Sequence, residues 1–387
     1  MGVINGIGGA WYDYCAYRII GMETKKIDHV FLALVLALTT GGFFVFVSAA
    51  FGLLAREGAQ FQSVLASQIF LGLGGGLLAL WFASRTQYQI WRRYAPALFV
   101  VALLFTALVF VPSIGFEHGG AKRWIFLGPV SFQPSEFLKL ASIIALSAWL
   151  SGIRGRAHSF TRGFLPFLII AALTGTLLLL QPDMGTYLTL AAGICGVFIV
   201  AGGKWKHLTA FILLVAIVAV LYAMAKPHAL DRVLTFVDPS RDPTGSSWQI
   251  QQSLIAIGSG GIAGKGFGQS VQKFGFLPEP IGDSVFAVAA EEFGFIGAGA
   301  IIVLFLLFLA RGLSIARRAP DQFGGLLVSG IVIMIAAQAF LNIGAIMGVL
   351  PLTGVPLLFV SHGGTALFFA LLGAGIVLNV SRYVRKT

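Results

Sequence analysis

The sequence predicts an all-α polytopic membrane protein with about ten transmembrane helices and a large extracytoplasmic loop between helices seven and eight. Of its 387 residues, 57% are hydrophobic and only 11% are charged, whereas a soluble domain carries about 25% charged residues. The apolar residues gather in runs of roughly 18 or more, long enough to cross a bilayer as a helix. The 49 glycines suit helices that pack closely in lipid. These features exclude a soluble globular protein.

Ten apolar stretches are long enough, or nearly so, to span the hydrocarbon core as helices. The fourth is the weakest, because it contains the charged residues Glu136 and Lys139. The expected spans are 29–54, 62–84, 95–113, 134–151, 163–181, 185–203, 207–225, 285–310, 322–349 and 355–380.

The positive charges agree with ten crossings. Seventeen of the 26 lysines and arginines lie in the six segments on one side of the membrane, and eight lie on the other. Basic loops remain in the cytoplasm, so we expect both termini there. The chain then divides into a cytoplasmic segment 1–28, a membrane domain 29–380 with an outer loop at about 226–284, and a cytoplasmic tail 381–387. This topology accounts for the net charge of +11, so we expect no nucleic-acid partner.

The long outer loop is too apolar for a disordered segment. Its residues 247–257, SWQIQQSLIAI, are expected to form an amphipathic helix that either lies on the membrane or re-enters it. The glycine-rich stretch 258–268 follows. It lacks the serine or threonine after lysine that a phosphate-binding loop needs. It is either a tightly turned segment or a set of backbone amides near a ligand phosphate.

Two carboxylates, Glu279 and Asp283, lie four residues apart where this loop returns to the membrane. The prolines Pro278 and Pro280 oppose helix formation around Glu279. Asp283 precedes the eighth span, where an aspartate often caps a helix. A carboxylate at the water–lipid boundary is equally a base that could reach a lipid-linked substrate.

Charged residues within the spans are costly and therefore indicate either pairing or function. Glu136 and Lys139 are spaced i, i+3, so they either neutralise each other or line a polar cavity. Glu291 and Glu292 lie in the eighth span.

Two further outer segments carry candidate residues. Lys122 and Arg123 precede the fourth span beside a tryptophan. They are either an interfacial anchor or a site for an anionic headgroup or pyrophosphate. The segment 350–365 is dense in proline and glycine, which indicates a broken helix near the outer face. It contains Ser361 and His362. A histidine there is either a packing residue or a titratable group.

Five ordered motifs resemble the SEDS family of shape, elongation, division and sporulation proteins, which includes FtsW and RodA. Together they cover about 120–370, and Ser270–Lys273 is closer to the FtsW branch. The motifs are AKRWIFLGPVSFQPSEFLK at 121–139, QPDMGT at 181–186, QQSLIAIGSGG at 251–261, FLPE with DSVFAVAAEEFG within 276–294, and PLTGVPL with FVSHGG within 351–364.

The resemblance implies a peptidoglycan glycosyltransferase that polymerises lipid II on the outer face of the bacterial cytoplasmic membrane. It implies a divalent cation, Mg²⁺ or Mn²⁺, for which Asp283 is a possible ligand. The implied partners are a class B penicillin-binding protein, other divisome proteins, membrane lipids and the substrate lipid II.

The resemblance also assigns roles to residues. Asp283 matches the family's catalytic carboxylate, and Glu279 matches the glutamate of the loop motif. Arg123, Glu136 and Lys139 match residues of the family's central cavity. We expect the substrate-binding residues to be Arg123, Lys122, Glu136, Lys139, Glu279, Lys273, Ser361 and His362.

Three other functions remain open at this stage. The chain could transport lipid II between leaflets, serve elongation as RodA does rather than septal synthesis, or act as a non-catalytic scaffold for a penicillin-binding protein. A scaffold would need neither Asp283 nor a metal ion.

Overall fold

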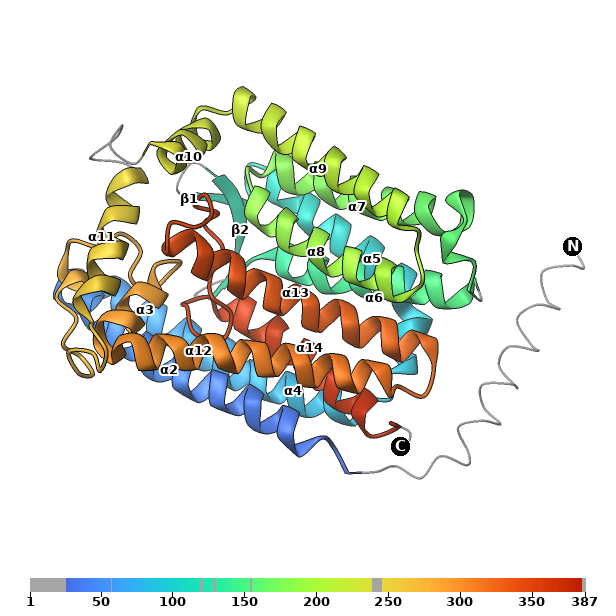
Figure 1. The fold of residues 1–387 in the computed structure, drawn as a ribbon, viewed down its shortest axis with the longest axis horizontal. Coiled ribbons are helices and arrows are strands. Elements are labelled where there is room, and N and C mark those ends of the chain that lie inside the picture. The colour runs from blue at the N-terminus through green and yellow to red at the C-terminus, as the bar shows by residue number, and fades with distance from the viewer. Residues whose placement is uncertain are drawn as a thin grey trace, which may run out of the picture.

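The computed structural model describes residues 26–56, 58–118, 121–127, 130–153, 155–238 and 246–384. The predicted cytoplasmic segment lies outside these residues over 1–25, as does the tail over 385–387. The fold is a bundle of long helices with a small sheet at one end (Figure 1).

Helices make up most of the described chain. They are α2 (His29–Arg56), α3 (Gly58–Ala66), α4 (Gly76–Arg85), α5 (Gln89–Ala107), α6 (Pro134–Gly152), α7 (Leu165–Leu180), α8 (Met184–Val200), α9 (Trp205–Ala225), α10 (Pro227–Val237), α11 (Ser246–Ser259), α12 (Val285–Arg317), α13 (Gln322–Ile346) and α14 (Gly364–Ser381). Short π-helical or 3₁₀ segments cover Ser67–Gly75, Leu108–Phe110, Arg156–His158, Phe160–Phe164 and Gln272–Phe274.

Each of the ten predicted spans corresponds to a helix. Within the described residues, eight helical stretches are long and apolar enough to cross a membrane. The shorter apolar helix α8 and the 19-residue helix α6, which carries Glu136 and Lys139, account for the other two. The chain is therefore an all-helical polytopic membrane protein, as predicted. The last span differs at its start, because α14 begins at Gly364 and residues 351–363 are non-helical.

A small antiparallel sheet, which the sequence analysis did not predict, forms between α5 and α6. Its strands are β1 (Gly115–His118), β2 (Ala121–Leu127) and β3 (Val130–Phe132), in the order β1-β2-β3. Gly115 pairs with Ile125, and Leu127 pairs with Val130. The sheet lies with α10 and α11 at one end of the bundle, opposite the start of α2 and the end of α14 (Figure 1).

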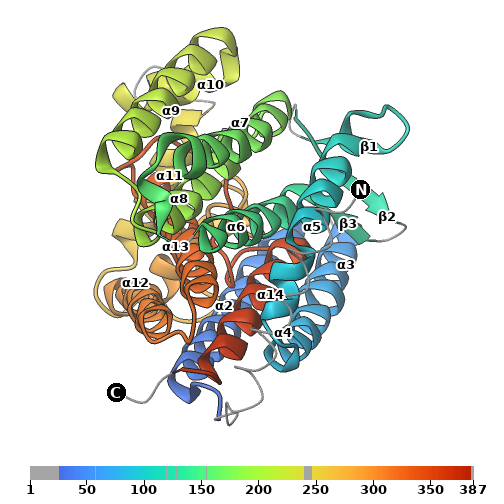
Figure 2. The same cartoon turned by 90° about the vertical axis from the view of Figure 1, so that its right-hand side faces the viewer.

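Helices α13 and α14 form the centre of the bundle. About four-fifths of each spanning window is buried, 78% for α13 and 83% for α14. Figure 2 shows α13 enclosed by α6, α8, α12 and α14. Gly330 permits this packing, because a Cβ there would lie 2.5 Å from the Val197 side chain and 2.6 Å from the Ile143 side chain.

The glycine-rich stretch of the outer loop fits into a break in α12. The helix is interrupted at Gly294, where φ is 64° and ψ is −163°. The amides of Lys265 and Gly266 donate to the carbonyls of Glu291 and Glu292 at 3.0 and 2.9 Å. These donors are therefore occupied within the chain, which favours the turned segment over a phosphate site.

The two glutamates of α12 bind the same loop through ion pairs. Glu291 pairs with Lys265 at 2.7 Å, and Glu292 pairs with Lys273 at 2.7 Å. The Lys273 ammonium also donates to Ser48 Oγ and to the Gly268 carbonyl, both at 2.9 Å. Because its three hydrogens have partners and its side chain is 0% exposed, Lys273 cannot meet a substrate pyrophosphate. The substrate-binding role expected for Lys273 is corrected to a structural one.

We predict that Lys273→Met lowers thermal stability strongly. The change leaves Glu292 as an uncompensated buried charge, a loss of about 3–5 kcal/mol. This loss of stability is measured as a decrease in the midpoint of thermal unfolding in detergent. Lys206→Met, at an exposed position, is the control and should leave the midpoint unchanged. Equal midpoints for the two variants would contradict the assigned role of Lys273.

Candidate functional site

Asp283 lies two residues before the start of α12, in the short stretch that links the outer loop to the helix. Its backbone carbonyl accepts a hydrogen bond from the Asn342 side-chain amide at 2.8 Å. The same amide donates to the Val355 carbonyl at 2.8 Å. Asn342 on α13 therefore joins Asp283 to the non-helical segment 351–363.

The Asp283 carboxylate is hydrogen-bonded to α11. The residue preceding α12 is Ser284, and its side chain makes no capping hydrogen bond. The Asp283 carboxylate instead accepts a hydrogen bond from Gln249 Nε2 on α11 at 3.2 Å. Gln249 also donates to Ser284 Oγ at 3.0 Å. This geometry favours a chemical role for Asp283 over helix capping.

Glu279 begins the turn that carries Asp283. Its φ of 48° is positive, and its carbonyl accepts from the amides of Gly282 and Ser284 at 3.0 and 3.2 Å. Burial, followed by the negative charge of Glu279, raises the pKa of Asp283 to about 6, although the positive charge of Arg232 opposes the rise. The two carboxylates therefore act on each other electrostatically.

Arg232 on α10 belongs to the site. The sequence alone indicated only that it is one of the basic residues on the outer side of the membrane. Burial lowers its pKa, and the like charge of Arg123 adds to this effect, while Asp283 and Asp183 raise it. Its guanidinium lies over segment 351–363, because a Cβ on Gly354 would be 3.4 Å from Nη1 and Nη2. The sequence feature that could have identified Arg232 is its position on a short amphipathic helix inside the long loop.

Arg123 on β2 contacts the turn between α7 and α8. It donates to the carbonyls of Gln181, at 3.3 Å, and Pro182, and its Nη1 lies 3.7 Å from Asp183 Oδ1. Asp183 in turn caps α8, because its Oδ1 accepts from the Thr186 amide at 3.3 Å. The QPDMGT motif thus positions Arg123.

Lys122 and Arg123 lie at an irregularity of β2. Phe116 pairs with Trp124 and Glu117 with Lys122, so Arg123 is the extra residue of a β-bulge. The Lys122 side chain is exposed, whereas Arg123 is half-buried. Arg123 therefore has defined contacts in the site, whereas the substrate-binding role expected for Lys122 stays a prediction.

Glu136 and Lys139 form a buried chain of polar contacts below segment 351–363. The Lys139 ammonium lies 2.9 Å from Glu136 Oε1 and donates to Gln338 Oε1 at 2.6 Å. Gln338 Nε2 then donates to the Pro356 carbonyl at 3.0 Å. Both charged side chains are at least 95% buried. Of the two alternatives, mutual neutralisation is what the contacts show.

Segment 351–363 is fixed by hydrogen bonds on several sides. The His362 amide donates to the Ile281 carbonyl at 2.7 Å, which ties the segment to the Asp283 turn. Ser361 Oγ accepts from the Leu357 amide at 2.8 Å. Burial lowers the pKa of His362 to about 4, so its ring is neutral at pH 7 and stacks on Phe46. Ser361 and His362 therefore shape the segment and add no charge.

The structure brings five charged residues into one electrostatically coupled group, which we call the outer polar cluster: Arg123, Asp183, Arg232, Glu279 and Asp283. Within the described residues, no group of three or more histidine, cysteine or acidic side chains could hold a metal ion. Glu279 and Asp283 supply two carboxylates, and Mg²⁺ binds through one or two carboxylates together with substrate phosphates. The donor set thus fits a cation that a phosphorylated substrate helps to bind.

The fold and the cluster define a class, namely a multi-pass membrane protein with a charged site at one end of its bundle. A family model described as "Cell cycle protein", covering FtsW, RodA and SpoVE, matches residues 28–386. The chain belongs to this family.

Curated relatives match over nearly the whole chain. Stage V sporulation protein E of Bacillus subtilis is 39% identical over 94% of this chain and 100% of its own length. The probable peptidoglycan glycosyltransferase FtsW of Trichlorobacter lovleyi is 39% identical over 92% of this chain and 93% of its own length.

Solved structures agree. A chain from a peptidoglycan synthase complex, described as coordinating polymerization and crosslinking, has a TM-score of 0.74 and 32% identity and covers 92% of this chain and 98% of its own. The rod-shape-determining protein RodA of Thermus thermophilus has a TM-score of 0.66 and 29% identity. The match covers 93% of this chain and 98% of the RodA chain.

We predict opposite shifts in the pKa of Asp283 when its two charged neighbours are neutralised. Arg232→Gln removes a cation and should raise the pKa further above its ordinary value, whereas Glu279→Gln removes an anion and should lower it. Infrared difference spectra against pH would follow the protonated carboxyl band, and Asp283→Asn identifies it. Shifts of the same sign in both variants would contradict the arrangement.

Proposed function

We propose that this chain is a peptidoglycan glycosyltransferase that polymerises lipid II into glycan strands, in septal cell-wall synthesis. The observation that carries the proposal is the outer polar cluster, in which a half-buried carboxylate with a pKa of about 6 is electrostatically coupled to the Arg232 guanidinium, and Arg232 is in turn coupled to Arg123. Membership of the FtsW/RodA/SpoVE family supports it, as do relatives named peptidoglycan glycosyltransferase.

The reaction is an inverting displacement at a sugar carbon. The 4-hydroxyl oxygen of one lipid-linked glycan forms a bond to the anomeric carbon of another. The bond from that carbon to the lipid pyrophosphate breaks, and the pyrophosphate leaves with the electron pair. Asp283 takes the hydroxyl proton as the new bond forms, and the cluster holds the two membrane-bound substrates in line.

The pKa of Asp283 suits a general base. A carboxylate with the ordinary aspartate pKa of about 4 would be ionised but weakly basic. A pKa of about 6 leaves the group ionised at neutral pH and makes it a stronger base. Burial and the charge of Glu279 supply this property.

The guanidinium groups of Arg232 and Arg123 balance the charge of the pyrophosphate. Arg232 is electrostatically coupled to Asp283, Asp183 and Arg123. Fixed cations in a partly dehydrated site stabilise developing negative charge strongly. Asp183 and the carbonyls of Gln181 and Pro182 keep Arg123 in position.

A divalent cation, Mg²⁺ or Mn²⁺, completes the proposed site. Glu279 would hold it together with the substrate phosphates, which leaves the Asp283 carboxylate free to act as the base. When bound, it would supply positive charge to the leaving pyrophosphate.

The membrane orientation follows from the basic loops. The end of the bundle with the sheet, α10 and α11 faces outward, and both chain termini face the cytoplasm. A class B penicillin-binding protein is the proposed partner for crosslinking. The similar chain from a synthase complex of polymerization and crosslinking supports this pairing. Other divisome proteins and membrane lipids complete the proposed surroundings.

We predict that Asp283→Asn lowers polymerisation of labelled lipid II about 100-fold or more, because a general base contributes that much. The assay uses liposomes, Mg²⁺ or Mn²⁺, and a transpeptidase-inactive partner. Asp231→Asn, an exposed carboxylate on α10, is the matched control and should retain wild-type activity. Equal polymer from the wild type and Asp283→Asn would remove Asp283 as the base. No polymer from the wild type, where a control polymerase works, would favour a flippase or a scaffold.

The rate should also depend on pH in a defined way. Asp283 acts only when deprotonated, so the rate is highest above its pKa and falls as the pH drops through about 6. One unit below the pKa the rate should be about tenfold lower. Glu279→Gln should move this acidic limb to lower pH. If the acidic limb of the pH–rate profile is unchanged in Glu279→Gln, a group other than Asp283 controls the rate.

A further inference from the structure

A second site lies at the opposite end of the bundle from the outer polar cluster. A hollow of about 540 Å³ opens between α5, α6 and α7, within the range of about 300–1,000 Å³ typical of ligand pockets. It is lined by Arg92, Ala95, Pro96, Phe99, Ala145, Ala148, Trp149, Pro166, Ile169 and Ile170.

The sequence explains why the helices do not close here. Ala95, Ala145 and Ala148 leave room where larger side chains would interdigitate. Pro96 lies inside α5 and cannot donate the helical hydrogen bond to the Arg92 carbonyl. That oxygen, at one end of the hollow, therefore lacks its ordinary helical donor.

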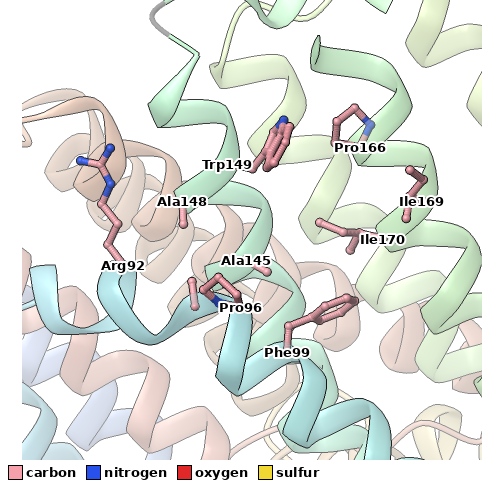
Figure 3. Close-up of a pocket in the computed structure, with 10 residues that line it drawn as sticks. Arg92, Pro96, Phe99, Ala145, Ala148, Trp149, Pro166, Ile169 and Ile170 are labelled. Atoms are coloured by element: carbon pink, nitrogen blue, oxygen red, sulfur yellow. The ribbon is translucent and has the colours of Figure 1, made fainter. Parts of the chain in front are cut away.

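The hollow has one polar end and one apolar end. Figure 3 shows Arg92 and Trp149 toward one end and Phe99 toward the other. Arg92 and Phe99 are seven residues apart on α5, so the hollow extends about 10 Å along the helix. This length lies within one leaflet of a hydrocarbon core that is about 30 Å thick.

The polar end is positively charged and at the depth of lipid headgroups. Arg92 lies in the first turn of α5, whose N-terminus is at the predicted cytoplasmic face. Its guanidinium is 6.0 Å from the Phe323 ring and has no ion pair among the residues that the structure describes. Arg156 and Arg162 follow in the connection between α6 and α7.

Trp149 fixes the level of the interface. Its side chain is 51% exposed, and its indole N–H donates to the Arg162 carbonyl at 2.9 Å. Tryptophan prefers the boundary between headgroups and acyl chains. The exposed Ile169 and the ring of Phe99 continue the apolar wall toward the membrane centre.

We propose that this hollow binds one acyl chain of an anionic phospholipid of the cytoplasmic leaflet, with the headgroup phosphate at Arg92. The combination of a cation at headgroup depth, an interfacial indole and an apolar hollow directly below selects a lipid over a soluble ligand. The site is separate from the proposed catalytic cluster and stands whether or not that function is correct.

The test compares retained lipids by native mass spectrometry. The protein is reconstituted in vesicles of equal phosphatidylglycerol and phosphatidylcholine and then extracted in mild detergent. We expect preferential retention of phosphatidylglycerol, and a decrease of about fivefold in Arg92→Gln, because one arginine near the surface contributes about 1 kcal/mol. Arg93→Gln, whose guanidinium lies over Tyr94 instead, should stay within about twofold of the wild type.

A second pair of variants tests the hollow itself. Ala148→Leu fills it and should reduce retained phosphatidylglycerol, whereas Ala97→Leu, exposed elsewhere on α5, should not. Equal retention of the two lipids by the wild type would overturn the proposal, because it indicates apolar binding alone. Wild-type retention in Arg92→Gln or in Ala148→Leu would overturn it as well.

Discussion

The side-chain amide of Asn342 joins the parts of the protein on which the outer site depends. It donates to the carbonyls of Asp283 and Val355, both at 2.8 Å, and so connects α13 to the start of α12 and to segment 351–363. Asn342 is 1% exposed, and hydrogen bonds in such dry surroundings are costly to lose. The position of Asp283 is therefore set by a helix of which 78% of the spanning window is buried.

The outer site is therefore built from segments that are remote in sequence and anchored separately. Arg123 is held by the turn before α8, Asp283 by α11 and α13, and Arg232 lies over Gly354. Two ion pairs fix the outer loop to α12. Glu291 pairs with Lys265, and Glu292 pairs with Lys273. Charges within the spans thus stabilise the fold, while those at its outer end remain available for chemistry.

Much of the fold could be predicted from the sequence, because each helix must satisfy its own backbone in lipid and so requires a visible apolar run. Asp283 was identified by its place at the end of the long loop and by the family motif. The partners of Lys273 and the role of Arg232 could not be predicted, because they depend on contacts across large sequence separations. The sheet was missed because three short strands carry little periodicity.

The role of α13 in positioning Asp283 is tested by steady-state glycan synthesis with Asn342→Leu, in preparations that remain folded and bind the partner. The substitution keeps the size of the side chain but removes both donors that hold Asp283 and Val355. We expect kcat to fall about tenfold or more, because small displacements of a catalytic group are costly, while KM stays within about twofold of the wild type. A wild-type kcat in the folded variant would contradict the claim that α13 positions Asp283 for catalysis.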